Sequence, residues 1–280
     1  MELINGKELA GQIEDGIAGE INMHPESRPN LAIILVGNRP DSNLYVRLKE
    51  KHAKEVGIDT HVYRLEEASA TQEELLDVIK FLNNDSEIDG ILLQLPLPEN
   101  FDANAAVAAI SPDKDVDGFT AEALSHLTET SNPKRLLSPV FLAVLTCLET
   151  ADPDWRTKSI AVAGKDTIFS NNLLSLLQAE GAKTELLTMP IDSLKSRSAN
   201  ILITALGIAG IITESEIAPN SIVIDIGISQ NAEGKTVGDV APGAAKEAAY
   251  LTPVPGGIGP LTIAFALKNT LEAYNRHKHI

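Results

Sequence analysis

Two hydrophobic patterns alternate along the chain, one typical of buried strands and the other of helices. Short apolar, often β-branched runs predict strands at Leu31–Val36, Ile91–Leu95, Ser159–Ala163, Ile201–Ala205 and Ser221–Ile226. Longer segments with apolar residues at helical spacing predict helices at Asp41–Val56, Thr71–Leu82, Asn171–Glu180 and Leu261–Tyr274. Gly57 and Gly181 follow the first and third helices, where glycine commonly ends a helix. This alternation predicts an α/β fold with a mostly parallel sheet covered on both faces.

The strands and helices fall into two series. The first extends from the N-terminus to about Gly118, and the second from about Ser159 to about Val240. A polar stretch that contains proline, Thr150–Asp154, lies between them, and 280 residues are enough for two domains. We therefore predict two lobes, each a mostly parallel sheet with flanking helices, and a ligand-binding cleft between the lobes.

Composition and charge exclude several classes of protein. Lys and Arg number 23 against 39 Asp and Glu, which gives a net charge of −16. Such a surface repels phosphate backbones and anionic lipids, so we expect neither nucleic-acid nor membrane binding. Cys147 is the only cysteine, which excludes an intrachain disulfide and a cysteine-built zinc site. The N-terminus lacks a signal-peptide pattern and no apolar run has the length of a membrane span, so a cytoplasmic location is expected.

Three polar residues are candidates for catalysis. The predicted helix Asp41–Val56 places Tyr45 and Lys49 four residues apart and hence on one face. A desolvated lysine loses proton affinity and can act as a base, and a nearby phenol can orient it or pass a proton. Gln94 stands near the end of a buried strand, where ligands gather in open parallel sheets. A solvated lysine on an amphipathic helix and an amide that caps a strand exit are the structural alternatives.

Two loops carry candidate binding residues. The loop Ser111–Phe119 holds three aspartates and a lysine. A surface turn and a metal site both suit this composition, although the spacing falls short of a calcium loop. One of its carboxylates could instead accept paired hydrogen bonds from an amino-pyrimidinone edge of a ligand. The loop Thr252–Pro260 combines prolines with glycines, so it is either stiff and open to a closely approaching ligand or a structural turn.

The second series begins with a strand that ends at Gly164-Lys165-Asp166. A strand, a turn and a helix form the layout for phosphate binding at a helix N-terminus. Only one glycine is present, however, so the G-x-G-x-x-G pattern is absent, and Asp166 replaces the hydroxyl residue that a P-loop needs. The local motif alone therefore does not establish a nucleotide site.

Taken in order, these segments resemble the bifunctional methylenetetrahydrofolate dehydrogenase/methenyltetrahydrofolate cyclohydrolase (FolD) family. The likeness spans nearly the whole chain, and the long C-terminal motif is highly specific. The matching residues are Val36–Asn38, Ser42–Val46, Lys49, Asp89–Pro98, Lys114–Phe119, Val223–Ile228, Gly238–Val240, Thr252–Thr262 and Asn269–Thr270.

The resemblance implies an enzyme of one-carbon folate metabolism. It implies hydrolysis of 5,10-methenyltetrahydrofolate to 10-formyltetrahydrofolate and NAD(P)-dependent oxidation of 5,10-methylenetetrahydrofolate. It also implies a folate-binding catalytic domain over residues 1–120 plus 252–280, a Rossmann-like dinucleotide-binding domain over 121–251, and a homodimer. The implied site residues are, for catalysis, Lys49 with its aromatic partner Tyr45 and the positioning amide Gln94; for substrate binding, Asp117, which grips the pterin ring, with Pro255, Gly256 and Gly257; and for the cofactor, Gly164, Lys165, Asp166 and Ile228, with no metal.

The dinucleotide half departs from the family pattern. The family segment P-C-T-P-x-G aligns with Leu136–Phe141, where only the second proline is kept, and G-R-S-x-x-V-G-x-P aligns with Gly164–Asn172. Asp166 places a negative charge near the expected 2′-phosphate of NADP. Three outcomes stay open: NADP binds weakly or in a shifted pose, NAD binds with Asp166 accepting from a ribose hydroxyl, or the protein is a cyclohydrolase alone. A non-catalytic folate-binding regulator is the alternative to an enzyme.

Overall fold

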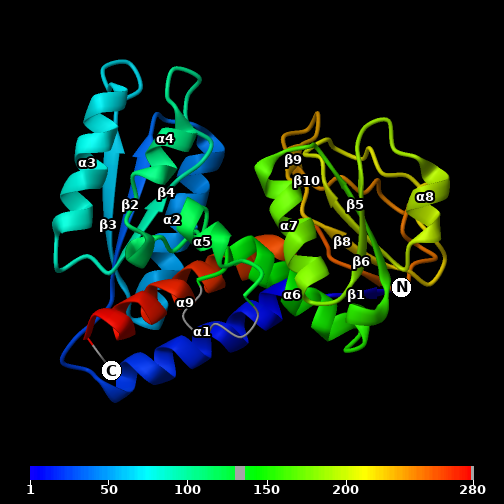
Figure 1. Ribbon diagram of the computed structural model, residues 1–280, viewed down its shortest axis with the longest axis horizontal. Coiled ribbons are helices and arrows are strands. Elements are labelled where there is room, and N and C mark those ends of the chain that lie inside the picture. Colours follow the sequence, from blue (N-terminus) through cyan, green and yellow to red (C-terminus); the bar gives the residue numbers. More distant parts are fainter. Residues whose placement is uncertain (130–135, 279–280) are drawn as a thin grey trace. The chain divides into compact units, whose positions relative to one another are not determined.

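The structure is a computed structural model that describes residues 1–129 and 136–278, and these form two compact units. One unit comprises residues 10–125, 136–139 and 263–278 around a three-stranded sheet. The other comprises residues 1–9, 126–129 and 140–262 around a six-stranded sheet. Helices α1 (Gly6–Met23) and α9 (Ile258–Lys278) contribute residues to both units (Figure 1). Among the described residues, no helix combines the length and the apolar content that a membrane crossing requires.

The three-stranded sheet is parallel, with the order β3-β2-β4. Alternate side chains of β2 belong to two different cores. Leu31, Ile33 and Leu35 pack with α1, α2 and α9, whereas their neighbours in sequence pack with α3 and α4. Burial on both faces explains why this strand is an unbroken apolar run. The elements of this unit are β2 (Asn30–Val36), α2 (Pro40–Val56), β3 (Asp59–Leu65), α3 (Gln72–Asn84), β4 (Gly90–Leu93), α4 (Ala103–Ala108), a 3₁₀ turn (Pro112–Lys114) and α5 (Ala121–Ser125).

The six-stranded sheet is also parallel, with the order β1-β11-β8-β7-β5-β6. The chain runs from β5 through α7 to β6 on one side, and then returns to add β7 on the other side of β5. The order of the strands therefore reverses at β5, as in a Rossmann-like sheet. The elements are β1 (Glu2–Leu3), α6 (Pro139–Ala151), a 3₁₀ turn (Trp155–Thr157), β5 (Ser159–Gly164), α7 (Ile168–Ala179), β6 (Lys183–Leu187), α8 (Ser193–Ser198), β7 (Ile201–Ala205), β8 (Ile222–Asp225), a hairpin of β9 (Ser229–Gln230) and β10 (Thr236–Val237), and β11 (Tyr250–Leu251).

Every strand and helix predicted from the sequence is present, with ends that differ by at most four residues. Gly57 adopts the left-handed conformation at the end of α2, with φ at 94°, as predicted for a helix stop. The sequence pattern missed the helices α1, α4, α5, α6 and α8, the strands β3 and β6, and the two-residue strands β1, β9, β10 and β11. Helix α1 holds four glycines, which weaken its local helical signal. Strands β3 and β6 are edge strands with polar residues on the exposed side, so neither forms a continuous apolar run.

The compact units differ at their ends from the predicted lobes. Residues 1–9 and 252–262, predicted in the first domain, lie in the unit of the six-stranded sheet, and residues 121–125 and 136–139, predicted in the second, lie in the unit of the three-stranded sheet. For residues 1–9 the reason is strand pairing, because β1 pairs in parallel with β11 and thereby joins the six-stranded sheet. The Ile4 amide then donates to the Leu251 carbonyl at 2.9 Å. A strand of two residues, such as β1, is too short to show a periodic pattern in the sequence.

Candidate active site

Lys49 and Gln94 meet at the carboxyl edge of the three-stranded sheet. Lys49 lies on α2, which follows the central strand β2, and Gln94 comes directly after β4. The strand order reverses at β2, so the helix after β2 and the loop after β4 are adjacent there. Lys49 Nζ donates a hydrogen bond to Gln94 Oε1 at 2.9 Å. The Gln94 amide group donates in turn to the Leu95 carbonyl at 2.8 Å, which keeps its oxygen toward the amine.

The Lys49 amine is removed from water, with only 8% of the residue exposed. Burial lowers the pKa of Lys49, and the negative charge of Asp117 opposes part of this shift. Burial also raises the pKa of Asp117 to about 6, while Lys49 lowers it and Asp115 raises it. Both groups are therefore shifted toward their neutral forms. More of the Lys49 amine is in its proton-accepting form near neutral pH than in an exposed lysine.

Tyr45 lies one helical turn before Lys49 and is half-buried. Its ring packs against the core of the three-stranded unit. Burial raises the pKa of the Tyr45 phenol, and the negative charge of Asp41 raises it further. The phenol therefore stays neutral at physiological pH. It can donate a hydrogen bond or present an aromatic face, but it cannot serve as a phenolate base.

Two charged residues of the loop before α5, Asp115 and Lys114, have structural roles. The buried Asp115 carboxylate accepts from the backbone amides of Asp117, Gly118 and Thr120 at 2.8 to 3.2 Å. The buried Lys114 amine donates to the carbonyls of Leu82 and Asp85 at the end of α3. These residues shape the loop that holds Asp117. Within residues 1–129 and 136–278, no group of three or more His, Cys, Asp or Glu side chains is arranged to hold a metal.

Asn269 of α9 holds the same loop from the other side. Its side-chain amide donates to the carbonyls of Val116 and Leu137, both at 2.9 Å, and the residue is buried. Val116 is the residue directly before Asp117, so Asn269 fixes the backbone on which that carboxylate is mounted. The sequence motif contained Asn269, but only the fold reveals this contact, because 153 positions separate Asn269 from Val116.

The predicted substrate loop Pro255–Gly257 lies in the unit of the six-stranded sheet. Gly256 has φ at 111°, which favours glycine, and the Gly257 amide donates to the Pro253 carbonyl at 2.7 Å. Pro255 is exposed, whereas both glycines are buried. The structure thus gives a backbone reason for the two glycines. Their role in substrate binding stays a prediction.

A pocket of about 310 Å³ lies at the carboxyl end of the six-stranded sheet, where the strand order reverses. Its walls come from the loops after β5, β7 and β8, including Lys165, Gly207 and Ile228. Two predicted cofactor residues, Lys165 and Ile228, therefore line it. Gly164 ends β5, next to Ser170. Asp166 is not part of the lining, and its carboxylate accepts from the Asn171 side chain at 2.9 Å.

Two segments of the chain match the two domains of one protein family. The catalytic domain of tetrahydrofolate dehydrogenase/cyclohydrolase matches residues 4–117, and the NAD(P)-binding domain of the same family matches residues 139–278. The chain belongs to this family. The bifunctional protein FolD of Wolinella succinogenes is 39% identical over 279 residues, which cover 98% of this chain and 96% of that protein. The resemblance predicted from the sequence is confirmed.

Solved FolD structures share the fold over the full length. The FolD dehydrogenase/cyclohydrolase of Campylobacter jejuni gives a TM-score of 0.92 at 34% identity and covers 99% of both chains. The Trypanosoma brucei FolD, in complex with NADP and an inhibitor, gives a TM-score of 0.91 at 31% identity and covers 99% of this chain and 98% of that one. The predicted α/β architecture of a FolD-type protein is thereby confirmed.

Sequence reasoning missed two buried aspartates that shape the NAD(P)-binding unit of this FolD family member. Asp239 accepts from the Thr204 hydroxyl and from the amides of Leu206 and Ile208. Asp225 accepts from the amides of Gly227, Asp239 and Val240. The two carboxylates thus fix the loops after β7 and β8, which line the pocket. The two aspartates lie in the matching segments Val223–Ile228 and Gly238–Val240. The glycines close to them in sequence were the signal that could have pointed to these residues.

The residues around this pocket suit an NAD(P) cofactor. Its position at the switch point of a parallel sheet, with the N-terminus of α7 beside it, provides backbone amides for a pyrophosphate. Lys165 supplies a positive charge. Phe141 is fully buried and packs against Phe169 with ring centroids 5.4 Å apart. Of these two rings, only Phe169 lines the pocket.

Proposed function

We propose that this chain hydrolyses 5,10-methenyltetrahydrofolate to 10-formyltetrahydrofolate and oxidises 5,10-methylenetetrahydrofolate with NAD(P). The observation that carries the proposal is the buried Lys49 amine, which is held by Gln94. The negative charge of Asp117 raises the pKa of this amine, against the effect of burial. Membership of the FolD family supports both reactions, since its models comprise a catalytic and an NAD(P)-binding domain. We further propose that the chain forms a homodimer in the cytoplasm. Light scattering would measure the number of chains per particle in solution.

Lys49 is the proton acceptor in the proposed hydrolysis. Water adds to the cationic methenyl carbon and gives its first proton to the amine. As the formyl C=O bond forms, the hydroxyl loses its second proton to solvent, the bond between that carbon and the ring nitrogen breaks, and the amine returns its proton to the nitrogen. Gln94 keeps the amine oriented. Tyr45, as a neutral phenol, can stack on the substrate or donate to it.

Asp117 is proposed to bind the amino-pyrimidinone edge of the pterin through paired hydrogen bonds. In the oxidation step, bound NAD(P) would supply the hydride acceptor, and Lys165 and Ile228 would contact it. The chain's own contribution to this step is to hold both ligands. A purified preparation that hydrolyses the methenyl substrate but reduces neither NAD nor NADP would indicate a cyclohydrolase alone. Folate binding without either activity would indicate a regulator.

Replacing Asp117 with asparagine is expected to weaken folate binding and to shift the pH profile. Loss of a charge-assisted hydrogen-bond pair should raise KM at least about tenfold. Asp117 raises the pKa of Lys49, so its removal lowers that pKa, and the rising limb of kcat against pH should move to lower pH. Steady-state hydrolysis between pH 5 and 9, with Asp113→Asn in the same loop as control, measures both effects. An unshifted limb would contradict the coupling.

Replacing Asp166 with serine is expected to raise the affinity for NADP. Asp166 is exposed beside the pocket, and a carboxylate a few ångströms from a 2′-phosphate costs about 1 kcal/mol in water. Its removal should therefore strengthen NADP binding about fivefold. NAD lacks the phosphate and serves as the internal control, so its affinity should stay constant or fall. Calorimetric titration with each dinucleotide measures this, and an equal gain for both would refute the charge argument.

A further inference from the structure

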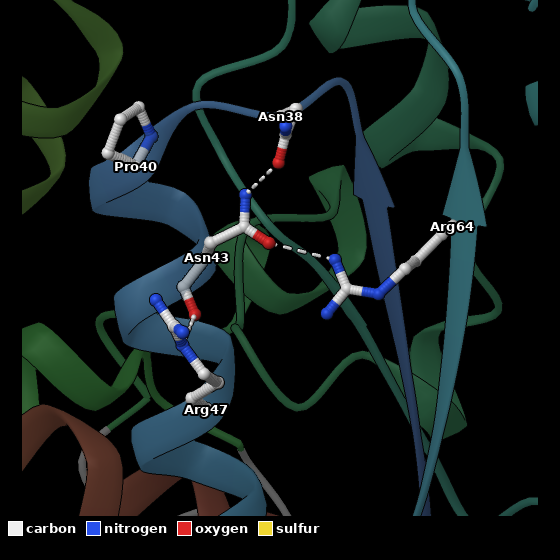
Figure 2. A pocket seen from close by; sticks show the side chains of 5 residues that line it. All are labelled: Asn38, Pro40, Asn43, Arg47 and Arg64. Atoms are coloured by element: carbon white, nitrogen blue, oxygen red, sulfur yellow. Dashed lines mark hydrogen bonds between the residues drawn. The ribbon is translucent and has the colours of Figure 1, made fainter.

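A second polar pocket lies in the three-stranded unit, apart from Lys49 and Gln94. It measures about 330 Å³ and is lined by Asn38, Pro40, Asn43, Arg47 and Arg64 (Figure 2). Asn38 follows β2, Arg64 is near the end of β3, and the other residues belong to the first half of α2. The pocket therefore opens at the carboxyl edge of the sheet and beside the N-terminal end of a 17-residue helix.

Asn43 tethers both arginines in this pocket. Its side-chain oxygen accepts from Arg64 Nη1 at 2.9 Å, and its main-chain oxygen accepts from Arg47 Nε at 3.3 Å. Its amide nitrogen donates to Asn38 Oδ1 at 2.9 Å, which fixes the orientation of the amide group (Figure 2). Both guanidinium groups are thus held by neutral oxygens, and their remaining N–H donors and positive charges are available to a ligand.

The charges of these two arginines are not neutralised by neighbouring acids. Among the ion pairs within residues 1–129 and 136–278, none includes Arg47 or Arg64, and no residue that lines the pocket is acidic. Asp41, the acid in the first turn of α2, is paired with Arg39 at 2.8 Å. Two unpaired arginines at one pocket are notable in a chain with a net charge of −16.

This pocket is distinct from the candidate active site. Asn43 and Arg47 are four residues apart on α2, as are Tyr45 and Lys49. A two-residue offset turns a helix by about 200°, so the two pairs lie on opposite sides of α2. Their burial agrees with this, because Arg47 is exposed and Lys49 is buried. Only about one helix diameter, about 10–12 Å, separates the two faces.

We propose that Asn43, Arg47 and Arg64 form an oxyanion-binding site for carboxylate or phosphate groups. Two guanidinium groups line one pocket, each bonded to Asn43, and guanidinium N–H groups are the donors that such anions prefer. The anion could come from additional γ-linked glutamates on the tail of a folate bound at Lys49, a source that rests on the proposed function. A γ-linked unit has five backbone bonds where an α-linked residue has three, so it extends to about 6 Å. Three or four such units would span half the circumference of α2, which is about 16–19 Å. A free phosphate-bearing or carboxylate-bearing metabolite is the other source.

Direct titration tests the site without any enzyme activity. The probes are inorganic phosphate and a γ-linked triglutamate peptide, added to the full chain in calorimetry. The double variant Arg47→Gln/Arg64→Gln should bind at least about tenfold more weakly whichever of these probes binds to the original chain. Asn43→Asp keeps both arginines but places a carboxylate between them, and it should cause the same loss. Arg28→Gln removes an exposed arginine elsewhere in the same unit and should have no effect.

The pattern of binding identifies the source of the anion. If triglutamate binds, KM for a pentaglutamyl folate should be lower than for the monoglutamyl form, and the double variant should lose this difference while its monoglutamyl kcat stays unchanged. If only phosphate binds, the site serves a free anion and the two folates should give equal KM values. The proposal is overturned if neither probe binds, or if the double variant binds like the original chain. An inactive enzyme that still binds the peptide would refute the proposed function and retain this site.

Discussion

Replacing Lys49 with methionine is expected to lower kcat for 5,10-methenyltetrahydrofolate hydrolysis by about 10²–10⁴-fold, the usual contribution of a positioned acid–base group. Methionine fills a similar volume, so the buried position remains packed. The substitution removes the hydrogen bond to Gln94 and the buried amine whose charge lowers the pKa of Asp117. The decrease in absorbance of the methenyl substrate with time measures the rate of hydrolysis.

A matched lysine on the same helix separates chemistry from charge. Lys51 is two residues further along α2 and is exposed. Lys51→Met changes the net charge by the same amount and should keep full activity. Equal turnover by the original chain and the Lys49 variant would remove Lys49 from the mechanism. Equal losses in both variants would instead indicate a general effect on the helix.

Replacing Gly6 with alanine is expected to destabilise the protein by about 2–4 kcal/mol, the range of severe steric substitutions. A Cβ atom on Gly6 would lie 1.9 Å from the Gly257 carbonyl oxygen. The added Cβ atom is attached to one backbone segment and would clash with another, and neither segment can move easily to relieve the clash. Residues before Gly6 are paired to β11, and the Gly257 amide is bonded to the Pro253 carbonyl. The free energy of unfolding from urea denaturation measures the loss.

Gly16 provides the control in the same helix. It is exposed near the middle of α1, and an added Cβ would meet nothing within 4 Å. Gly16→Ala should therefore stabilise the helix by about 0.5–1 kcal/mol, the usual propensity difference. Opposite signs for the two substitutions would support the contact between Gly6 and Gly257. A Gly6→Ala variant as stable as the original chain would show that this close approach is not maintained.

Much of the fold could be predicted because parallel sheets leave a direct trace in sequence. Strands β2, β5 and β7 are buried on both faces, and each is a short apolar run between helical segments. The edge strand β3 left no such trace, since its residues are alternately exposed and partly buried. Helix α1 was missed because its position depends on the packing of Ile17 and Ile21 against the core rather than on local propensity.

The candidate site was predictable to a different extent. Lys49, Tyr45 and Gln94 could be singled out from helical spacing and strand ends, and the motif resemblance added Asp117. The sequence did not reveal that Asp115 and Lys114 bond to the backbone while the charge of Asp117 acts on the Lys49 amine. Neighbouring charges in one loop are equivalent in a sequence. Only contacts with distant segments distinguish them.

The sequence by itself therefore determined the α/β class, the family and the residues that carry the candidate chemistry, because periodicity and motifs are local properties. The tertiary structure decided which of those residues meet. It brought Lys49 to Gln94 across 45 positions and Asn269 to Val116 across 153. It also paired Asn43 with Arg64 in the second pocket. Burial, and with it the shifted pKa values of Lys49 and Asp117, arises only when such distant segments exclude water together.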